Sequence, residues 1–251
     1  MSNTAKLCII CNTRKPESQF ESKGEHIVPR FLGNRKLCTP HVCSTCNGGL
    51  GGTVDLALKN VFKITLACAD RGVVGVQTNP LSTDSVDANG LTLFDRLFDP
   101  LKRERATQNS PYKNPDIKGA MLKIAYETAH LRLGNNWLHD PIAVSARSAL
   151  YAYVRKERET ARERVNSIPM YEIPMDIFYL AMNKSRSETL KKAISNKSCL
   201  NGLWLVPFAK PNNAGSLAVV IDIEGLTPIY VVVSDSLWNI TAPELLSPIL
   251  N

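Results

Sequence analysis

CIIC at residues 8–11 and CSTC at residues 43–46 decide the fold of the N-terminal part of this chain. Two C-x-x-C motifs separated by residues 12–42 have the spacing of a structural zinc site, in which each motif contributes two thiolates. Incidental buried cysteines would not explain two paired motifs in so short a segment. We therefore expect one Zn²⁺ ion to be bound by four thiolates, those of Cys8, Cys11, Cys43 and Cys46.

The expected zinc ion is structural. Four thiolates complete a tetrahedral coordination sphere and leave no open position for a substrate or an activated water. A domain of about 65 residues holds a small core, and zinc binding would supply the missing folding free energy. Any catalysis in this part of the chain therefore needs a second site. The remaining cysteines, Cys38, Cys68 and Cys199, are expected to be small buried hydrophobic residues.

The composition indicates a globular protein with net positive charge. Of the 251 residues, 44% are hydrophobic, which is enough for a core and for two or three compact parts. The 30 Lys and Arg residues against 23 Asp and Glu give a net charge of +7, which favours polyanionic partners but is weak evidence alone. No signal peptide and no membrane-spanning apolar run is found, so we expect a soluble cytoplasmic protein without a membrane partner, in which cysteines bind metal rather than form disulfides.

The segment between the two motifs is expected to form a hairpin. One short extended piece ends at His26–Ile27, and a second, residues 36–42, leads into CSTC. After the second motif, residues 53–68 have apolar residues at the three-and-four spacing of an amphipathic helix. The expected order is C-x-x-C motif, hairpin, C-x-x-C motif, helix.

Together, CIIC, EHIVP (residues 25–29) and HVCSTCNGG (residues 41–49) resemble the HNH endonucleases. That family has a ββα-metal core, a treble clef that holds zinc in this subset. The resemblance implies an acidic residue and a histidine at the end of the first strand, a polar residue on the second, and a His or Asn after the second motif. These positions fall on four residues of this chain: Glu25, His26, His41 and Asn47.

The chemistry of phosphodiester hydrolysis fits these residue types. It needs a base that deprotonates water and a cation that neutralises charge on the transition state. His26 suits the base, because imidazole titrates near neutral pH. Glu25 and Asn47 offer hard oxygen ligands for Mg²⁺ or another divalent cation. His41 is the second expected catalytic residue; it could orient His26, act as an extra ligand, or face solvent.

Two features of the motif region leave alternatives open. Adjacent strand residues point to opposite faces, so Glu25 and His26 share one site only if the strand ends or twists there. The four glycines of GGLGG, within residues 48–52, are poor helix formers. Either the helix begins at Thr53, or the glycines let a phosphate backbone approach closely.

After residue 69 we expect a connector and a helical region, followed by a region that contains both helix and strands. Residues 70–115 read as an irregular connector with a hairpin, followed by one helix from Lys118 to a stop at Gly134 and another over residues 142–165. RKERETARER reads as a solvated helical face, with i to i+4 pairs between its charges. His130 and His139 are expected in structural or surface roles.

After Pro169 we expect a short helix at SETLKKAI and an antiparallel meander of GLWLVPF, LAVVIDI and PIYVVVS. The expected fold class is therefore α+β, in three parts. These are a zinc-containing HNH nuclease domain over 1–69, a connector and helical region over 70–168, and an α+β region over 169–251.

The expected function is that of an HNH endonuclease that hydrolyses DNA, with restriction or phage defence as the setting by association. The alternative is a non-catalytic zinc module that binds nucleic acid or a protein partner, since treble clefs support many functions. RNA as a further substrate and a homo-oligomeric state remain open.

Overall fold

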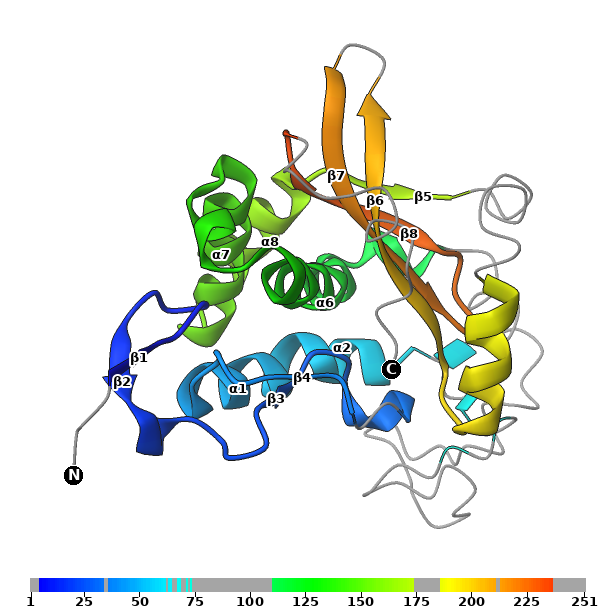
Figure 1. The fold of residues 1–251 in the computed structure, drawn as a ribbon, viewed down its shortest axis with the longest axis horizontal. Helices are drawn as coiled ribbons and strands as arrows, with labels where there is room; N and C mark the ends of the chain where they lie inside the picture. The colour runs from blue at the N-terminus through cyan, green and yellow to red at the C-terminus, as the bar shows by residue number, and fades with distance from the viewer. Residues whose placement is uncertain are drawn as a thin grey trace.

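The α+β class is confirmed by the computed structural model, in which N-terminal strands and a four-cysteine cluster lie beside a helix, a helical middle follows, and an antiparallel sheet ends the fold (Figure 1). In the described part of the chain, no helix is long and apolar enough to cross a membrane. The expected connector with its hairpin lies almost wholly outside the described residues. Those residues are 5–33, 36–61, 63–64, 67–68, 71, 73, 110–173, 186–210 and 213–236.

Two short hairpins form the N-terminal part. Strands β1 (Ala5–Leu7) and β2 (Arg14–Pro16) pair antiparallel around the first C-x-x-C motif. Strands β3 (Glu25–His26) and β4 (Cys38–Thr39) pair antiparallel as the expected hairpin. Gly24 precedes β3 with φ 74°, and a Cβ there would lie 2.7 Å from the backbone oxygen of Thr39. Glycine is therefore required where the chain enters this hairpin.

The helix of the second motif begins earlier than one expectation placed it. Helix α1 (Ser44–Leu50) starts directly after Cys43 and runs through a π-helical turn, Gly51–Asp55, into α2 (Leu56–Lys59). A helix start at Thr53 is therefore wrong. A Cβ at Gly49 would lie 3.0 Å from the Cα of Val154, so this glycine allows a close approach between helices.

Helix α6 (Pro115–Leu133) lies at the centre of the molecule, between α1 and α2 on one side and the C-terminal sheet on the other (Figure 1). The side chain of Asn114 caps it by accepting from the backbone N–H of Asp116, and Gly134, with φ 74°, ends it as expected. Nearly every residue from Asp116 to His130 is buried. The apolar stripe expected on one face therefore understates the burial of this helix.

The helix expected over residues 142–165 is two helices. Helix α7 (Pro141–Val154) and helix α8 (Arg158–Ser167) are separated by a turn in which Lys156 has φ 64°. A non-glycine residue at positive φ ends an α-helix, so the continuous helix was wrong. The expected solvated face of RKERETARER also makes a tertiary contact, because Arg162 forms an ion pair with Asp116 of α6.

The C-terminal meander is confirmed. A helix covers residues 186–195, and the four-stranded antiparallel sheet has the order β5-β8-β7-β6. One face of this sheet belongs to the main hydrophobic core, which it shares with α6. Trp204, buried on the sheet, belongs to a second, smaller core cluster. The bounds are β5 (Met170–Glu172), β6 (Leu200–Lys210), β7 (Asn213–Ile223) and β8 (Ile229–Ser234).

Candidate functional site

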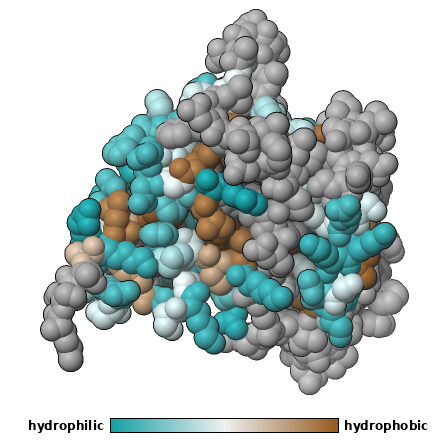
Figure 2. All heavy atoms as spheres, viewed as in Figure 1, coloured by the Kyte–Doolittle hydropathy of each residue, from teal (hydrophilic) through white to brown (hydrophobic). Residues whose placement is uncertain are grey.

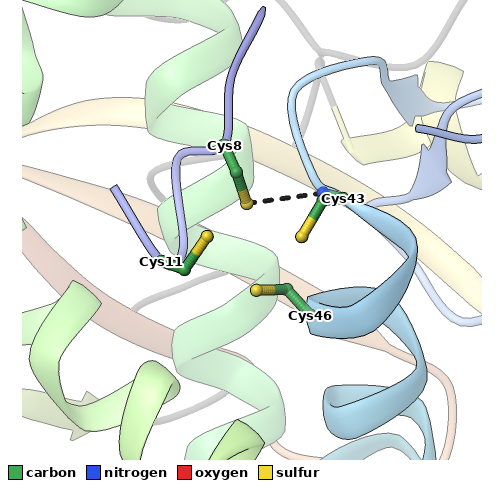
Figure 3. A group of neighbouring side chains, drawn as sticks. All are labelled: Cys8, Cys11, Cys43 and Cys46. Carbon is green, nitrogen blue, oxygen red and sulfur yellow. Dashed lines mark hydrogen bonds between the residues drawn. The ribbon is translucent and has the colours of Figure 1, made fainter. Parts of the chain in front are cut away.

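Four cysteines converge on one point between the first hairpin and the start of α1 (Figure 3). Their Sγ atoms all lie within 4.8 Å of one another, and the backbone N–H of Cys43 donates to Sγ of Cys8 at 3.4 Å. Tetrahedral zinc with Zn–S bonds of about 2.3 Å holds its sulfurs about 3.8 Å apart, so the donor set fits such an ion. The members of this set are Cys8, Cys11, Cys43 and Cys46.

The electrostatics of the cluster fit a bound cation. A hydrogen bond from the Cys46 thiol lowers the pKa of Cys8 to about 4, and the same bond raises the pKa of Cys46. Without a cation, the thiols therefore cannot all ionise together. A divalent metal ion would stabilise all four thiolates at once, and the cluster can hold a metal such as zinc.

His26 lies beside Cys38 in the β3–β4 hairpin. The two residues are direct partners across the antiparallel pair, so their side chains share one face, and Nδ1 of His26 is 3.3 Å from Sγ of Cys38. Burial and the charge of Glu25 raise the pKa of the Cys38 thiol, which therefore stays protonated at neutral pH. Cys38 is half-buried, so the expectation that it is simply a buried hydrophobic residue is wrong, whereas Cys68 and Cys199 are buried.

Glu25 makes a buried ion pair with a residue of the central helix. Its Oε1 accepts a hydrogen bond from Nζ of Lys123 at 2.7 Å, and the same ammonium donates to Oδ2 of Asp55 at 2.8 Å. Lys123 has no exposed side-chain surface, and Glu25 is 5% exposed. Burial raises the pKa of Glu25, and the charge of Lys123 offsets this only in part. Among the described residues, none donates a hydrogen bond to Oε2 of Glu25.

A third carboxyl group completes what we call the Lys123 cluster, formed by Glu25, Asp55, Lys123 and Glu127. Glu127 lies one helical turn after Lys123, and neither of its carboxylate oxygens has a hydrogen-bond partner among the described residues. Burial raises the pKa of Glu127 well above its ordinary value. Burial alone would lower the pKa of Lys123, but the surrounding carboxyl groups together raise it, so the ammonium stays charged.

The sequence predicted only Glu25 of this cluster. Lys123 was missed because amphipathic periodicity assigns a lysine to the solvated side of a helix, whereas α6 is buried on nearly all sides. Asp55 was missed because it follows the glycines, where the helix was expected to be only starting. The residue type of Asp55 was a usable signal, since it is the first carboxylate after the second C-x-x-C motif.

Asn47 lies in the first turns of α1 and is tied to the loop before β3. Its Nδ2 donates to Oε1 of Glu21 at 2.8 Å. Its amide oxygen accepts no hydrogen bond from the described residues. Glu21, which the sequence reasoning did not single out, thus orients the side chain of Asn47.

The structure places His41 at the wall of a cavity between the first hairpin and α7. Its ring contacts that of His130 edge to face, with centroids 5.0 Å apart. Burial, followed by His130 and Lys6, lowers the pKa of His41, so its imidazole is neutral at pH 7. The cavity has a volume of about 410 Å³ and is lined by Lys6, Leu7, Asn12, Arg14, His41, Asn135, Leu138, His139 and Arg147.

Among the comparisons with known proteins, a family model matches the N-terminal segment. Residues 8–63 match a family model described as HNH endonuclease. The match spans the four cysteines, both strands of the second hairpin and α1, and confirms the resemblance read from the motifs. Searches of curated proteins and of solved structures find no match. At the family level, the segment indicates a nuclease-type enzyme.

Proposed function

We propose that this chain is a metal-dependent HNH endonuclease that hydrolyses DNA phosphodiester bonds. The observation that carries this function is the ββα arrangement within residues 8–63, where β3 bears His26 and Glu25, and α1 bears Asn47. These are the residue types that a base and a hard cation site require. Helix α1 starts at the cysteine cluster, so bound zinc would fix it relative to the hairpins.

His26 is the proposed general base. Its contact with Cys38 supports a tautomer in which Nδ1–H donates to the sulfur, because this leaves the lone pair of Nε2 available to take a proton from water. A protonated Cys38 carries no charge that would hold His26 as an imidazolium. Cys38 is therefore a positioning residue for the base.

Glu25 and Asn47 are the proposed ligands of Mg²⁺ or another divalent cation, through Oε2 and Oδ1 respectively. Such a cation would neutralise charge on the scissile phosphate. The residues around these ligands restrict their movement: Lys123 holds the other carboxylate oxygen of Glu25, and Glu21 holds the amide nitrogen of Asn47. Ligands held by a second layer of hydrogen bonds need less ordering when the cation binds.

Plasmid nicking tests this function. We expect the wild-type protein to nick supercoiled plasmid when Mg²⁺ or Mn²⁺ is added, and His26→Ala to keep its zinc content and melting temperature but lose nicking. Undiminished cleavage by His26→Ala would exclude the assignment of the base. Single-stranded and duplex RNA in the same assay test whether RNA is also cut.

A non-catalytic zinc module that binds nucleic acid is the competing function. It explains the cysteines and the net charge of +7 equally well. It does not explain why the sequence has Glu25, His26 and Asn47 at the positions that the resemblance to the HNH endonucleases assigns to site residues. Metal-independent binding of plasmid without any cutting would favour the competing function. A setting in restriction or phage defence is tested by plating phage on cells that express either the wild type or His26→Ala.

A further inference from the structure

We infer that the cavity at His41 binds a phosphate group of the nucleic acid strand, and this source of the phosphate rests on the proposed nuclease function. We call it the His41 cavity, with the nine lining residues given above. Its volume of about 410 Å³ is in the range of roughly 300–1,000 Å³ typical of pockets that hold small groups. We propose this phosphate role for His41 in place of orienting His26 or acting as an extra metal ligand.

The charges that line the His41 cavity are all of one sign. Lys6, Arg14 and Arg147 supply three cations, and none of the nine lining residues is an Asp or a Glu. A concave surface with charge of one sign concentrates the electric field and attracts anions. The cavity therefore differs from the Lys123 cluster, in which carboxyl groups outnumber the single ammonium.

Uncharged donors in the cavity suit the several oxygens of a phosphate. Asn12 and Asn135 add amide groups, and the imidazole of His41 adds a ring N–H that can donate one hydrogen bond. Together with the cations, these groups come from the first hairpin, the segment between β4 and α1, the turn after α6, and α7, so donors approach from several directions. A tetrahedral anion with several acceptor oxygens uses such an arrangement better than a planar carboxylate does.

The ring of His41 packs against the buried ring of His130. His130 is 4% exposed, and its Nε2 forms a hydrogen bond with Oδ1 of Asn135 at 3.0 Å. Since an amide oxygen only accepts, Nε2 of His130 carries the proton, and the buried Nδ1 is an acceptor without a partner among the described residues. The edge-to-face contact places the ring of His41 against this unsatisfied ring. The backbone oxygen of His41 also accepts from Ile9, which ties the cavity to the first C-x-x-C motif.

A binding measurement that does not depend on cleavage tests this inference. We would measure the anisotropy of a fluorescent DNA duplex without added Mg²⁺, using variants in a His26→Ala background. Lys6→Glu/Arg14→Glu reverses two cavity charges. Lys191→Glu/Lys192→Glu is the matched control, because it makes the same change in net charge on exposed residues of the helix over 186–195. Zinc content and melting temperature check that both proteins are folded.

The cavity variant should bind the duplex about tenfold more weakly than the control variant. The slope of its log Kd against log salt concentration should also be smaller by about one to two, since each lost phosphate contact reduces this slope by about 0.9. Equal weakening of both variants would overturn the inference, because it would reflect net charge alone. Inorganic phosphate and a deoxynucleoside monophosphate serve as competitors. Tight binding of the monophosphate with unchanged duplex affinity in the cavity variant would exclude the strand as the source.

The phosphate site and the nuclease function can fail independently of each other in these experiments. If the wild type never cuts DNA but the cavity variant loses duplex binding, the nuclease assignment fails and the phosphate site stands. If the wild type cuts DNA and the cavity variant binds like the control, the phosphate site fails and the nuclease assignment stands.

Discussion

Cys38 lies directly across the β3–β4 pair from His26, within hydrogen-bonding distance of its Nδ1. Sulfur is a weak acceptor, and the thiol is kept neutral by burial and by Glu25. A hydrogen bond to the far nitrogen of a histidine fixes both the ring orientation and the tautomer. At the scale of the residue, this contact would leave Nε2 of His26, the proposed base, free to face a water molecule.

Replacing Cys38 should therefore change turnover more than binding. Cys38→Ala removes the partner of Nδ1, and we expect kcat for plasmid nicking to fall by about tenfold or more, with little change in KM. Cys38→Ser keeps a hydroxyl that can accept the same hydrogen bond and should recover most of kcat. Equal activity of Cys38→Ala and the wild type would show that the contact has no positioning role.

Lys123 is the other residue whose removal has a defined consequence. In Lys123→Met, the carboxylates of Glu25 and Asp55 lose their buried cation, and we expect the free energy of unfolding to fall by about 3–5 kcal/mol. Urea unfolding measures this loss. Lys118→Met on the same helix is the control, with an expected loss under about 1 kcal/mol, since Lys118 forms no ion pair with the described residues and donates an exposed hydrogen bond to the amide oxygen of Asn166.

The loss in Lys123→Met should depend on pH. Burial raises the pKa of Glu25 and the charge of Lys123 lowers it, so without the ammonium the pKa of Glu25 in the folded state lies further above that of the unfolded chain. A carboxyl group whose pKa is raised on folding costs nothing below its unfolded pKa and destabilises increasingly as pH rises. The deficit should thus be smaller at about pH 5 than at about pH 8. A deficit that does not change with pH would contradict an electrostatic cause.

At the scale of the elements, α6 is joined to α8 by a bidentate ion pair. Nε and Nη2 of Arg162 donate to the two carboxylate oxygens of Asp116, at 2.9 and 2.7 Å. These hydrogen bonds hold the pKa of Asp116 below its usual range. The hydroxyl of Tyr153 on α7 donates to the same carboxylate at 3.1 Å, so one side chain connects three helices.

Arg162→Gln should lower the free energy of unfolding by about 1 kcal/mol at neutral pH, a modest value because the arginine is 40% exposed. A carboxylate whose pKa is lowered on folding stabilises above its unfolded pKa, and this is lost as pH falls through the folded pKa. The difference from wild type should therefore persist at neutral pH and shrink below about pH 4. Urea unfolding at both pH values measures it, with Arg164→Gln as the control; a difference that persists in acid would contradict this origin.

Sequence patterns predicted elements better than they predicted the site. The motif spacing, the hairpin, α6 and the C-terminal meander follow from local residue order, and the structure contains all four. The break at Lys156 was not predicted, because nothing in the residue type indicates a positive φ there. The pairing of Lys123 with Glu25 joins residues 98 positions apart and depends on α6 being buried all round, which no local pattern encodes.

At the scale of the whole molecule, the four-cysteine cluster connects the first hairpin to α1. Cys43→Ser removes one ligand, and we expect loss of bound zinc and of soluble, folded protein, because zinc binding contributes to folding. Metal analysis and circular dichroism check this. Cys38→Ser is the matched control, since Cys38 lies outside the cluster and should keep one zinc ion per chain. A folded, zinc-free Cys43→Ser protein would refute a structural role for the metal.

Lys123 lies outside the segment that matches the HNH endonuclease family, yet it neutralises two carboxylates inside that segment. Residues 8–63 therefore do not form a self-contained structural unit. A chimera that transplanted them without α6 would carry Glu25 and Asp55 as uncompensated acids next to an uncovered apolar surface. A functional transplant of this segment into another protein would have to move α6, with its Lys123, along with residues 8–63.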